Sequence, residues 1–281
     1  MAVILSGKEL SEKLTQQQKQ RVAELKARGI YPGLAVVLVG EDPASTIYVR
    51  NKGIACETIG IYSETIRLPG DISQQQLEDT IQRLNEDKKI SGILVQLPLP
   101  EGLNEEAALA RILPEKDVDG FHLMNAGKLF TGQEGVIPCT PKGILYMLKD
   151  AGIALKGKEA VIIGRSNIVG KPAAMLLLQE HCTVTLCHSR TQDLQSHTRR
   201  ADILVAAIGK PRFVTADMVK PGAAVMDVGI NRVDGKVVGD VDYEPVSRVA
   251  GYITPVPGGI GKMTISMLME NTLEAACRQG R

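Results

Sequence analysis

The fold is decided by the stretch Val161-Ile-Ile-Gly-Arg-Ser-Asn-Ile-Val-Gly-Lys-Pro172. A short β-branched run ends at Gly164 and a helix is expected to begin near Gly170, so the pattern predicts a strand, a turn and a helix. Glycine allows a tight turn and the close approach of a ligand to the backbone. The amino end of the helix offers unpaired N–H groups and a positive dipole end, which suit a pyrophosphate. The stretch therefore predicts a dinucleotide-binding turn.

Strand-like and helical patterns alternate on both sides of this stretch. In the first half we expect strands at 34–39, 61–68 and 92–97, and helices over 7–28, 44–60 and 73–88. In the second half we expect strands at 160–163, 183–186, 203–207 and 223–228, a hairpin turn at Val233-Asp-Gly-Lys236, and a closing helix from Met263 to Arg278. This alternation favours parallel sheets with crossover helices. The sequence predicts two α/β domains, the second a Rossmann-like doubly wound parallel sheet, with a cleft between them.

Composition limits the class of protein. The 281 residues suffice for two modest domains, and Gly132 to Pro141 is the best linker. A net charge of +1 and an aromatic content of 3% favour neither a nucleic-acid nor a membrane partner, and no apolar run is long enough to span a bilayer. Five cysteines without a C-x-x-C pair favour reduced thiols and a cytoplasmic protein. His181 and His188 lack suitably spaced partners, so no metal site is expected.

The choice of dinucleotide follows from the second strand of the predicted binding fold. NAD-specific folds place an Asp or Glu at the end of that strand to hold the ribose hydroxyls. Here Thr183-Val-Thr-Leu-Cys-His-Ser-Arg190 ends without a carboxylate. Ser189, Arg190 and Arg165 can instead hold a 2′-phosphate, which favours NADP over NAD. Two alternatives stay open: an ordinary strand–helix turn, because Gly164 to Gly170 is not the G-x-G-x-x-G spacing, and arginines that are merely solvated.

A candidate chemical site lies in the first half. Tyr48 and Lys52 are four residues apart in a helical pattern, so they share a face with the apolar Ala55 and Ile59. A lysine on an apolar stripe can act as an acid or base near neutrality. The alternative is a lysine whose amine reaches solvent. Gln96 lies near the carboxyl end of a strand terminated by prolines, where ligands bind in open α/β sheets, or it serves as a capping amide.

Two further strings can contact a flat ligand. Asp117-Val-Asp-Gly-Phe121 places two carboxylates in a loop, and a carboxylate accepts two parallel N–H bonds of the kind a pterin ring offers. A plain turn or a cation loop fits the same string. Tyr252-Ile-Thr-Pro-Val-Pro-Gly-Gly-Ile-Gly-Lys-Met-Thr264 is stiffened by prolines and exposes backbone through its glycines. It is not a Walker A loop, because Met263 follows the lysine and Val256 takes the place of the first glycine.

Taken together, these segments resemble the bifunctional methylenetetrahydrofolate dehydrogenase/methenyltetrahydrofolate cyclohydrolase family. The matching strings, in order, are Asp42-Pro-Ala-Ser through Tyr48 and Lys52, Gln96-Leu-Pro-Leu-Pro100, Lys116-Asp-Val-Asp-Gly-Phe121, Pro138-Cys-Thr-Pro141, Gly164-Arg-Ser through Val169-Gly170, Asp227-Val-Gly-Ile-Asn231 and Thr254 to Thr264. One departure is Lys262, where the family's glycine loop usually has a second proline. We expect Lys262 to face the cleft and meet an anionic group of a ligand.

The resemblance implies a function and an organisation. It implies NADP-dependent oxidation of 5,10-methylenetetrahydrofolate and hydrolysis of the methenyl product to 10-formyltetrahydrofolate, in one-carbon metabolism and purine biosynthesis. It implies a folate-binding, catalytic domain over 1–138, completed by the C-terminal helix 263–281, and an NADP-binding domain over 139–262. A cytoplasmic homodimer is expected. The alternatives are an NADP-dependent oxidoreductase acting on another small substrate, such as a shikimate-type dehydrogenase, and a non-catalytic nucleotide-binding protein.

The resemblance also implies residue roles. Lys52 would be the acid/base of the hydrolysis with Gln96 beside it, while Tyr48 would pack on the folate and Asp119 would grip the pterin. Further substrate contacts would come from Leu97, Pro257, Gly258 and Gly259. NADP contacts would come from Gly164, Arg165, Ser166, Ile168, Ser189, Arg190 and Ile230.

Overall fold

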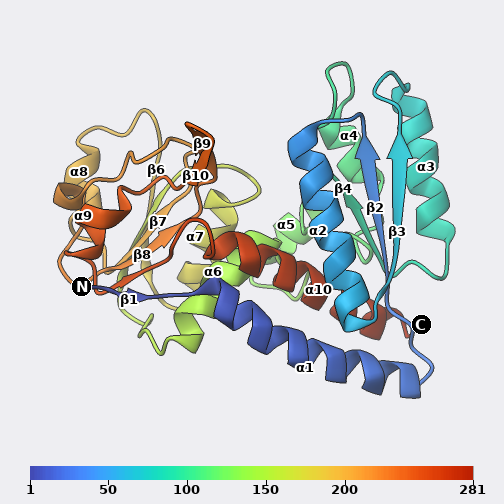
Figure 1. Ribbon diagram of the computed structural model, residues 1–281, viewed down its shortest axis with the longest axis horizontal. Coiled ribbons are helices and arrows are strands. Elements are labelled where there is room, and N and C mark those ends of the chain that lie inside the picture. The colour runs from blue at the N-terminus through green and yellow to red at the C-terminus, as the bar shows by residue number, and fades with distance from the viewer. Residues whose placement is uncertain (281) are drawn as a thin grey trace. The chain divides into compact units, whose positions relative to one another are not determined.

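The computed structural model describes residues 1–280 (Figure 1). The elements, in chain order, are β1 (Val3–Ile4), α1 (Gly7–Ala27), β2 (Gly33–Val39), α2 (Pro43–Ile59), β3 (Tyr62–Leu68), α3 (Gln74–Glu86), β4 (Gly92–Val95), α4 (Glu105–Arg111), α5 (Leu123–Phe130), α6 (Cys139–Asp150), β5 (Glu159–Ile163), α7 (Gly170–Gln179), β6 (Thr183–Cys187), α8 (Leu194–Thr198), β7 (Ile203–Ala206), the 3-10 helix η1 (Ala216–Met218), β8 (Ala224–Asp227), β9 (Asn231–Val233), β10 (Lys236–Val238), α9 (Tyr243–Ser247), β11 (Tyr252–Ile253) and α10 (Ile260–Gln279).

The chain forms two compact units, each named here by its main sheet. The three-stranded unit comprises Lys13–Cys139 and the chain from Ile265 onward. The six-stranded unit comprises Met1–Glu12 and Thr140–Thr264. The first residues of the chain thus group with the second half, because β1 pairs with β11 in parallel.

The three-stranded unit is built on a parallel sheet in the order β3-β2-β4. Every residue of β2 and β4 is buried, as their continuous apolar runs predict for strands covered on both faces. Alternate β2 residues, beginning with Ala35, pack with Leu77 and Ile81 of α3 in one core cluster. The predicted strand 92–97 ends at Val95, just before the proline-bearing turn, although the Gln96 N–H still donates to the Val37 carbonyl at 2.9 Å.

The helices of this unit begin at strong local signals. The Asp42 side chain accepts from the Ser45 N–H at 2.7 Å, and Pro43 occupies the first helical position of α2. Ser73 forms a reciprocal capping box with Gln76 at the start of α3. Both helices begin within a residue of their predicted starts, so the helix that carries Tyr48 and Lys52 is positioned by its own sequence.

The six-stranded unit is a doubly wound parallel sheet in the order β1-β11-β8-β7-β5-β6. β5 pairs with β6 on one side and with β7 on the other, so the strand order reverses between β5 and β7. This reversal is the switch point at which open α/β sheets bind ligands beyond their carboxyl ends. The predicted α/β class with a doubly wound second half is therefore confirmed.

Two details of the six-stranded unit bear on the sequence predictions. β9 and β10 form an antiparallel hairpin in which Val233 pairs with Lys236, and the turn residues Asp234 and Gly235 have φ of 49° and 74°. The predicted hairpin is confirmed. The last helix begins at Ile260 rather than Met263, because Gly261 lies in its first turn and does not interrupt it.

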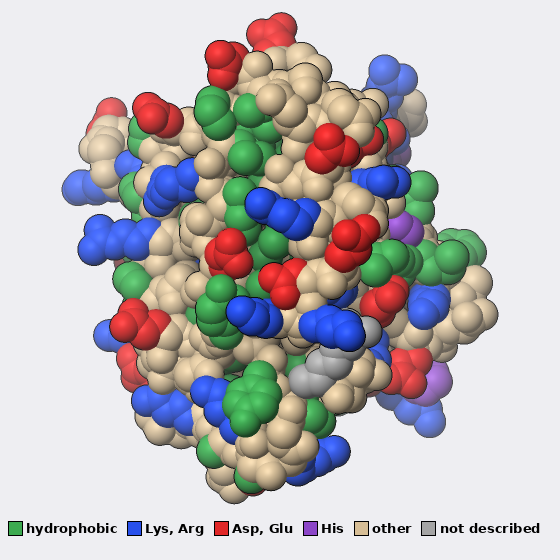
Figure 2. All heavy atoms as spheres, turned by 90° about the vertical axis from the view of Figure 1, so that its right-hand side faces the viewer, with side chains coloured by type: hydrophobic (Ala, Val, Ile, Leu, Met, Phe, Trp, Pro, Cys, Tyr) green, Lys and Arg blue, Asp and Glu red, His purple; other side chains and the backbone are tan. Residues whose placement is uncertain are grey.

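Among residues 1–280, none of the helices is long and apolar enough to cross a membrane. On the face drawn in Figure 2, basic and acidic side chains are interspersed rather than gathered by sign.

Candidate functional site

In the three-stranded unit, α2 and the end of β4 bring two predicted site residues together. The Lys52 Nζ donates to the Gln96 Oε1 at 2.9 Å, across 44 residues of sequence. The Gln96 Nε2 donates to the Leu97 carbonyl at 2.7 Å, which turns the amide oxygen toward the amine. The lysine is therefore held by a neutral acceptor rather than by a carboxylate hydrogen bond. A neutral acceptor fixes the orientation of the amine and adds no opposite charge.

Asp119 provides the negative charge of this site. Burial raises the pKa of Asp119 to about 6, the charge of Lys52 lowers it, Asp117 raises it, and a hydrogen bond with Cys139 lowers it. The Cys139 Sγ lies 3.9 Å from Asp119 Oδ1. Lys52, Gln96 and Asp119 thus form one electrostatically coupled group. Its carboxylate is poorly solvated and is available to a ligand that carries N–H donors.

The neighbouring Asp117 has a structural role. Its carboxylate accepts from the backbone N–H groups of residues 120, 121 and 122 at 3.0, 3.2 and 2.9 Å, and from the Asn125 Nδ2 at 2.8 Å. These bonds build the turn that follows Asp119. The turn predicted for the Asp117–Phe121 string is therefore built by Asp117, and the ligand contact predicted for Asp119 stays a prediction.

Sequence reasoning missed two residues that support this loop. The Lys116 side chain is buried, and its Nζ donates to the carbonyls of Leu84 and Asp87 at 3.0 and 2.8 Å, at the end of α3. Asn271 of α10 donates to the carbonyls of Val118 and Ile137, at 2.9 Å each. Lys116 lies in a quoted motif, but nothing in the motif indicates burial. Asn271 lies more than 150 residues away, and no local pattern points to it.

The other predicted substrate residues fall in both units. Tyr48 lies on α2 one turn before Lys52 and is 37% exposed, and Leu97 is partly exposed beside Gln96. The segment Pro257–Gly259 belongs to the six-stranded unit and leads directly into α10. There the Gly258 carbonyl accepts from the Lys8 N–H at 2.9 Å. Lys262 is exposed in the first turn of α10, and its predicted ligand contact stays a prediction.

The predicted dinucleotide turn lies at the switch point of the six-stranded sheet. Gly164 follows β5 with a φ of +125°, and a Cβ there would lie 2.1 Å from the carbonyl oxygen of Ala207, just after β7. Only glycine fits, both by conformation and by space. The turn therefore packs directly against the chain that follows β7, at the carboxyl ends of two neighbouring strands, which is where open α/β sheets bind their ligands.

The amino end of α7 differs from the prediction in one respect. The Ser166 Oγ accepts from the N–H groups of Val169 and Gly170 at 3.1 and 3.3 Å, so these two groups are not unpaired. The acceptor is the hydroxyl of Ser166, four residues before the first residue of α7. The Ser166 hydroxyl keeps its own proton for donation outward. A phosphate at this helix end would therefore meet the hydroxyl of Ser166 and the exposed Arg165.

The remaining predicted cofactor residues are exposed. After β6, the His188 N–H donates to Thr191 Oγ1 at 2.8 Å, and this turn carries Ser189 and Arg190 at its tip. No carboxylate follows the strand there, as the sequence predicts. Ile168 and Ile230 are 41% and 51% exposed, although both are large apolar side chains. Within the described part of the chain, no three His, Cys, Asp or Glu residues cluster as metal ligands would.

The fold defines an α/β protein of two units with parallel sheets, the second of them doubly wound as in dinucleotide-binding proteins. Comparison with known proteins is more specific. Residues 5–119 match the catalytic domain, and residues 138–280 the NAD(P)-binding domain, of the tetrahydrofolate dehydrogenase/cyclohydrolase family. The chain belongs to this family.

Individual relatives are similar to this protein in sequence and structure along its whole length. The bifunctional protein FolD of Halalkalibacterium halodurans is 57% identical over 275 residues, which cover 98% of this chain and 99% of the relative. The crystal structure of the bifunctional FolD methylenetetrahydrofolate dehydrogenase/cyclohydrolase from Campylobacter jejuni has a TM-score of 0.98 at 49% identity, covering 99% and 100% of the two chains. The Trypanosoma brucei dehydrogenase–cyclohydrolase, complexed with NADP and an inhibitor, has a TM-score of 0.95 at 38% identity, covering 100% and 99%.

Proposed function

We propose that this enzyme oxidises 5,10-methylenetetrahydrofolate with NADP and hydrolyses the methenyl product to 10-formyltetrahydrofolate. Membership of the family, and a full-length relative of known structure whose name gives both activities, support the two reactions. The observation that carries the proposal is the Lys52–Gln96 hydrogen bond with Asp119 beside it, because these are the groups that a pterin and a proton transfer require. An oxidoreductase for another small substrate would leave this arrangement without a role.

In the hydrolysis, water adds to the methenyl carbon and the bond from that carbon to N5 breaks. The added water loses two protons, one of which ends on N5 and the other in solvent. Lys52 donates or accepts them, and its hydrogen bond to Gln96 aims the amine. A positioned acid/base of this kind accelerates a reaction by about 10²–10⁴-fold. Asp119 would accept N–H bonds from the pterin, while Tyr48 and Leu97, and the Pro257–Gly259 segment, would pack against the folate.

For the oxidation, NADP supplies the hydride acceptor. The turn at Gly164 fits this group, since it lies at the switch point of the sheet and leads into the amino end of α7. Arg165 and Ser166 would hold its phosphates, Ser189 and Arg190 its 2′-phosphate, and Ile168 and Ile230 would pack on its rings. Holding the reactants in the reactive orientation lowers the barrier by about 7–11 kcal/mol. The protein therefore needs little acid–base catalysis for this step.

We further propose that the three-stranded unit is the folate-binding, catalytic domain, and that the six-stranded unit is the NADP-binding domain. The matched family domains support this division. The functional context would be one-carbon metabolism and purine biosynthesis in the cytoplasm, where five free thiols stay reduced.

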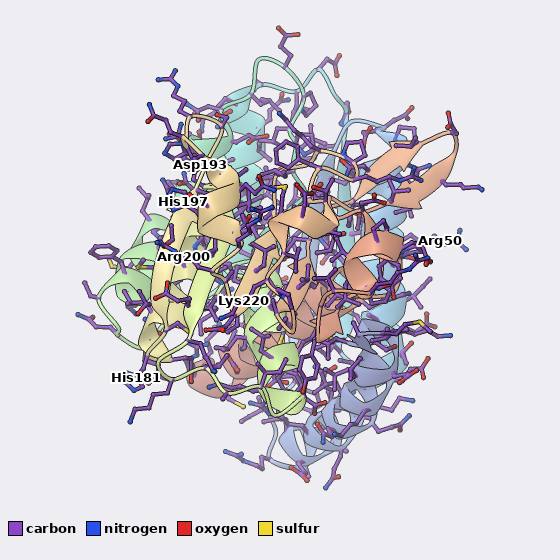
Figure 3. The ribbon with its side chains drawn as sticks, turned by 90° about the vertical axis from the view of Figure 1, so that its left-hand side faces the viewer. Arg50, His181, Asp193, His197, Arg200 and Lys220 are labelled. Atoms are coloured by element: carbon purple, nitrogen blue, oxygen red, sulfur yellow. The ribbon has the colours of Figure 1, made fainter. Side chains whose placement is uncertain are left out.

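We propose a homodimer as the working form. The edge strand β6 pairs only with β5 among the described strands, and Leu178 and Leu186 near this edge are 52% and 36% exposed. Arg200, labelled in Figure 3, donates to Thr185 Oγ1 on β6 at 2.7 Å. An ordered edge with exposed leucines can be covered by a second copy of the chain.

The proposed function is tested by Lys52→Met. We expect hydrolysis of methenyltetrahydrofolate to be lost, while NADPH formation from methylenetetrahydrofolate remains measurable at saturating substrate. Arg50→Met is the matched control, because Arg50 is an exposed cation on the same helix, two residues away and hence on another face (Figure 3). The control should keep both activities. Equal loss of both activities in Lys52→Met would contradict the assigned role, and absence of both from the wild type would refute the function.

A further inference from the structure

Two buried carboxylates in the six-stranded unit have no part in the chemistry above. Asp227 and Asp240 are 2% and 0% exposed. A buried charge is costly unless hydrogen bonds compensate it. Both carboxylates are compensated by neutral N–H donors. Asp227 accepts from the N–H groups of Gly229, Asp240 and Val241 at 3.0, 2.9 and 3.0 Å.

Asp240 ties together loops that follow different strands. Its Oδ2 accepts from the N–H groups of Ile208 and Gly209 at 2.7 and 2.9 Å, in the loop after β7. Its Oδ1 accepts from the Asn231 Nδ2 at 2.9 Å, at the start of β9. Both loops lie beyond the carboxyl ends of β7 and β8, next to the switch point. One side chain therefore sets the distance between two ligand-facing loops.

The packing around the pair leaves little freedom. A Cβ at Gly229 would lie 2.3 Å from Asp240 Oδ1, and a Cβ at Gly239 would lie 1.8 Å from Asp227 Oδ2. Each carboxylate thus contacts backbone where no side chain fits. Ile230 stands between the tied residues Gly229 and Asn231, yet its own side chain is 51% exposed. The loop presents an apolar side chain outward on a rigidly held backbone.

The course of a dinucleotide over this edge follows from the fold. Its adenosine end would lie by the turn after β6, and its pyrophosphate would lie at the Gly164 turn after β5. The nicotinamide half must then extend past the loops after β7 and β8, which are the loops that Asp240 ties. We propose that Asp240, seated on Asp227, is a positioning residue that holds the Ile208–Gly209 turn and Ile230 against the nicotinamide half of NADP. This inference rests on the proposed NADP-dependent function.

The test measures NADP affinity and the two activities separately. Asp240→Ala should raise the Kd and the KM for NADP at least ten-fold, while kcat/KM for methenyltetrahydrofolate hydrolysis stays within two-fold. Asp240→Asn should have a smaller effect, because the new amide can keep the two backbone bonds while the Asn231 amide rotates to accept from it. Asn231→Leu removes only the hydrogen bond between residue 231 and Asp240, beside Ile230, and should also weaken NADP binding.

A matched control separates positioning from stability. Asp202 lies in the same unit at the amino end of β7, where it accepts from the Glu159 N–H at 3.0 Å and from the Lys220 Nζ at 2.6 Å (Lys220 is labelled in Figure 3). Asp202→Ala should lower the Tm without changing the Kd for NADP.

A lower Tm in Asp240→Ala with an NADP Kd within two-fold of wild type would overturn the positioning role. Equal loss of NADP binding and hydrolysis would overturn it as well. If Asp240→Ala does not fold, Asp240→Asn and Asn231→Leu decide by the same readouts. Failure of the proposed function looks different, because the wild type itself would then neither bind NADP nor oxidise methylenetetrahydrofolate.

Discussion

Replacing Asp119 with Asn should stabilise the protein while it removes affinity for the substrate. Burial raises the pKa of this carboxyl from 3.8 to about 6, even though Lys52 lowers it. A raised pKa means that the folded state prefers the protonated form, so the ionised carboxylate costs stability. The difference corresponds to about 3 kcal/mol, since one pKa unit is about 1.36 kcal/mol. Asn is neutral and nearly isosteric, so about 3 kcal/mol is the largest gain we expect.

The sign of the pH dependence provides an internal control. Between pH 3.8 and about 6 the folded state holds more protons than the unfolded state, so the stabilising contribution of the wild-type carboxyl falls as pH rises through this window. The variant has no such dependence. Its advantage over wild type should be complete near pH 8 and should vanish near pH 4, as measured by the free energy of unfolding in urea.

A second variant provides a contrast of opposite sign. Asp117→Asn puts an amide among four donors and should destabilise the protein by about 2–3 kcal/mol at pH 8. Asp119→Asn should meanwhile weaken folate substrate binding at least ten-fold, because a charge-assisted acceptor is lost. If Asp119→Asn is less stable than wild type at pH 8, or is stabilised equally at pH 4, the reasoning about burial is wrong.

Two other changes address the cofactor. Arg190→Glu should weaken NADP binding at least ten-fold and shift the ratio of the affinities for NAD and NADP toward NAD. The reason is that a charge-assisted bond is worth about 1.5–3 kcal/mol and that Glu can hold ribose hydroxyls. Unchanged dissociation constants for both dinucleotides would mean that Arg190 is only a solvated cation. Gly164→Ala should abolish dinucleotide binding and lower the Tm, because the alanine Cβ would meet the Ala207 oxygen at 2.1 Å and φ is +125°. Titration with NADP measures the affinity, and a melting curve measures the Tm. Wild-type affinity would contradict the proposed pyrophosphate site at this turn.

The fold was predictable wherever local pattern and tertiary environment agree. β2 and β7 are apolar throughout, β5 and β8 are apolar except for the terminal Glu159 and Asp227, and each strand is almost entirely buried as such runs require. β1 and β11 were missed because two residues carry no periodicity, and these strands exist only through their pairing. The helices α4, α5, α6, α8 and α9 were also missed, since most are too short to show an amphipathic repeat.

The candidate site likewise has some features that local sequence determines and others that depend on tertiary contacts. By itself the sequence determined the glycine turn, the absence of a carboxylate after β6, and the shared helix face of Tyr48 and Lys52, because these depend on spacing along a few residues. Only the tertiary structure decided that Lys52 donates to Gln96, that Asp117 builds a turn while Asp119 does not, and that Asp240 ties two loops together. The contacts of Lys52 and Asp240 join segments far apart in the chain. The division between Asp117 and Asp119 depends on burial and on which N–H groups each carboxylate meets, and no local pattern encodes that.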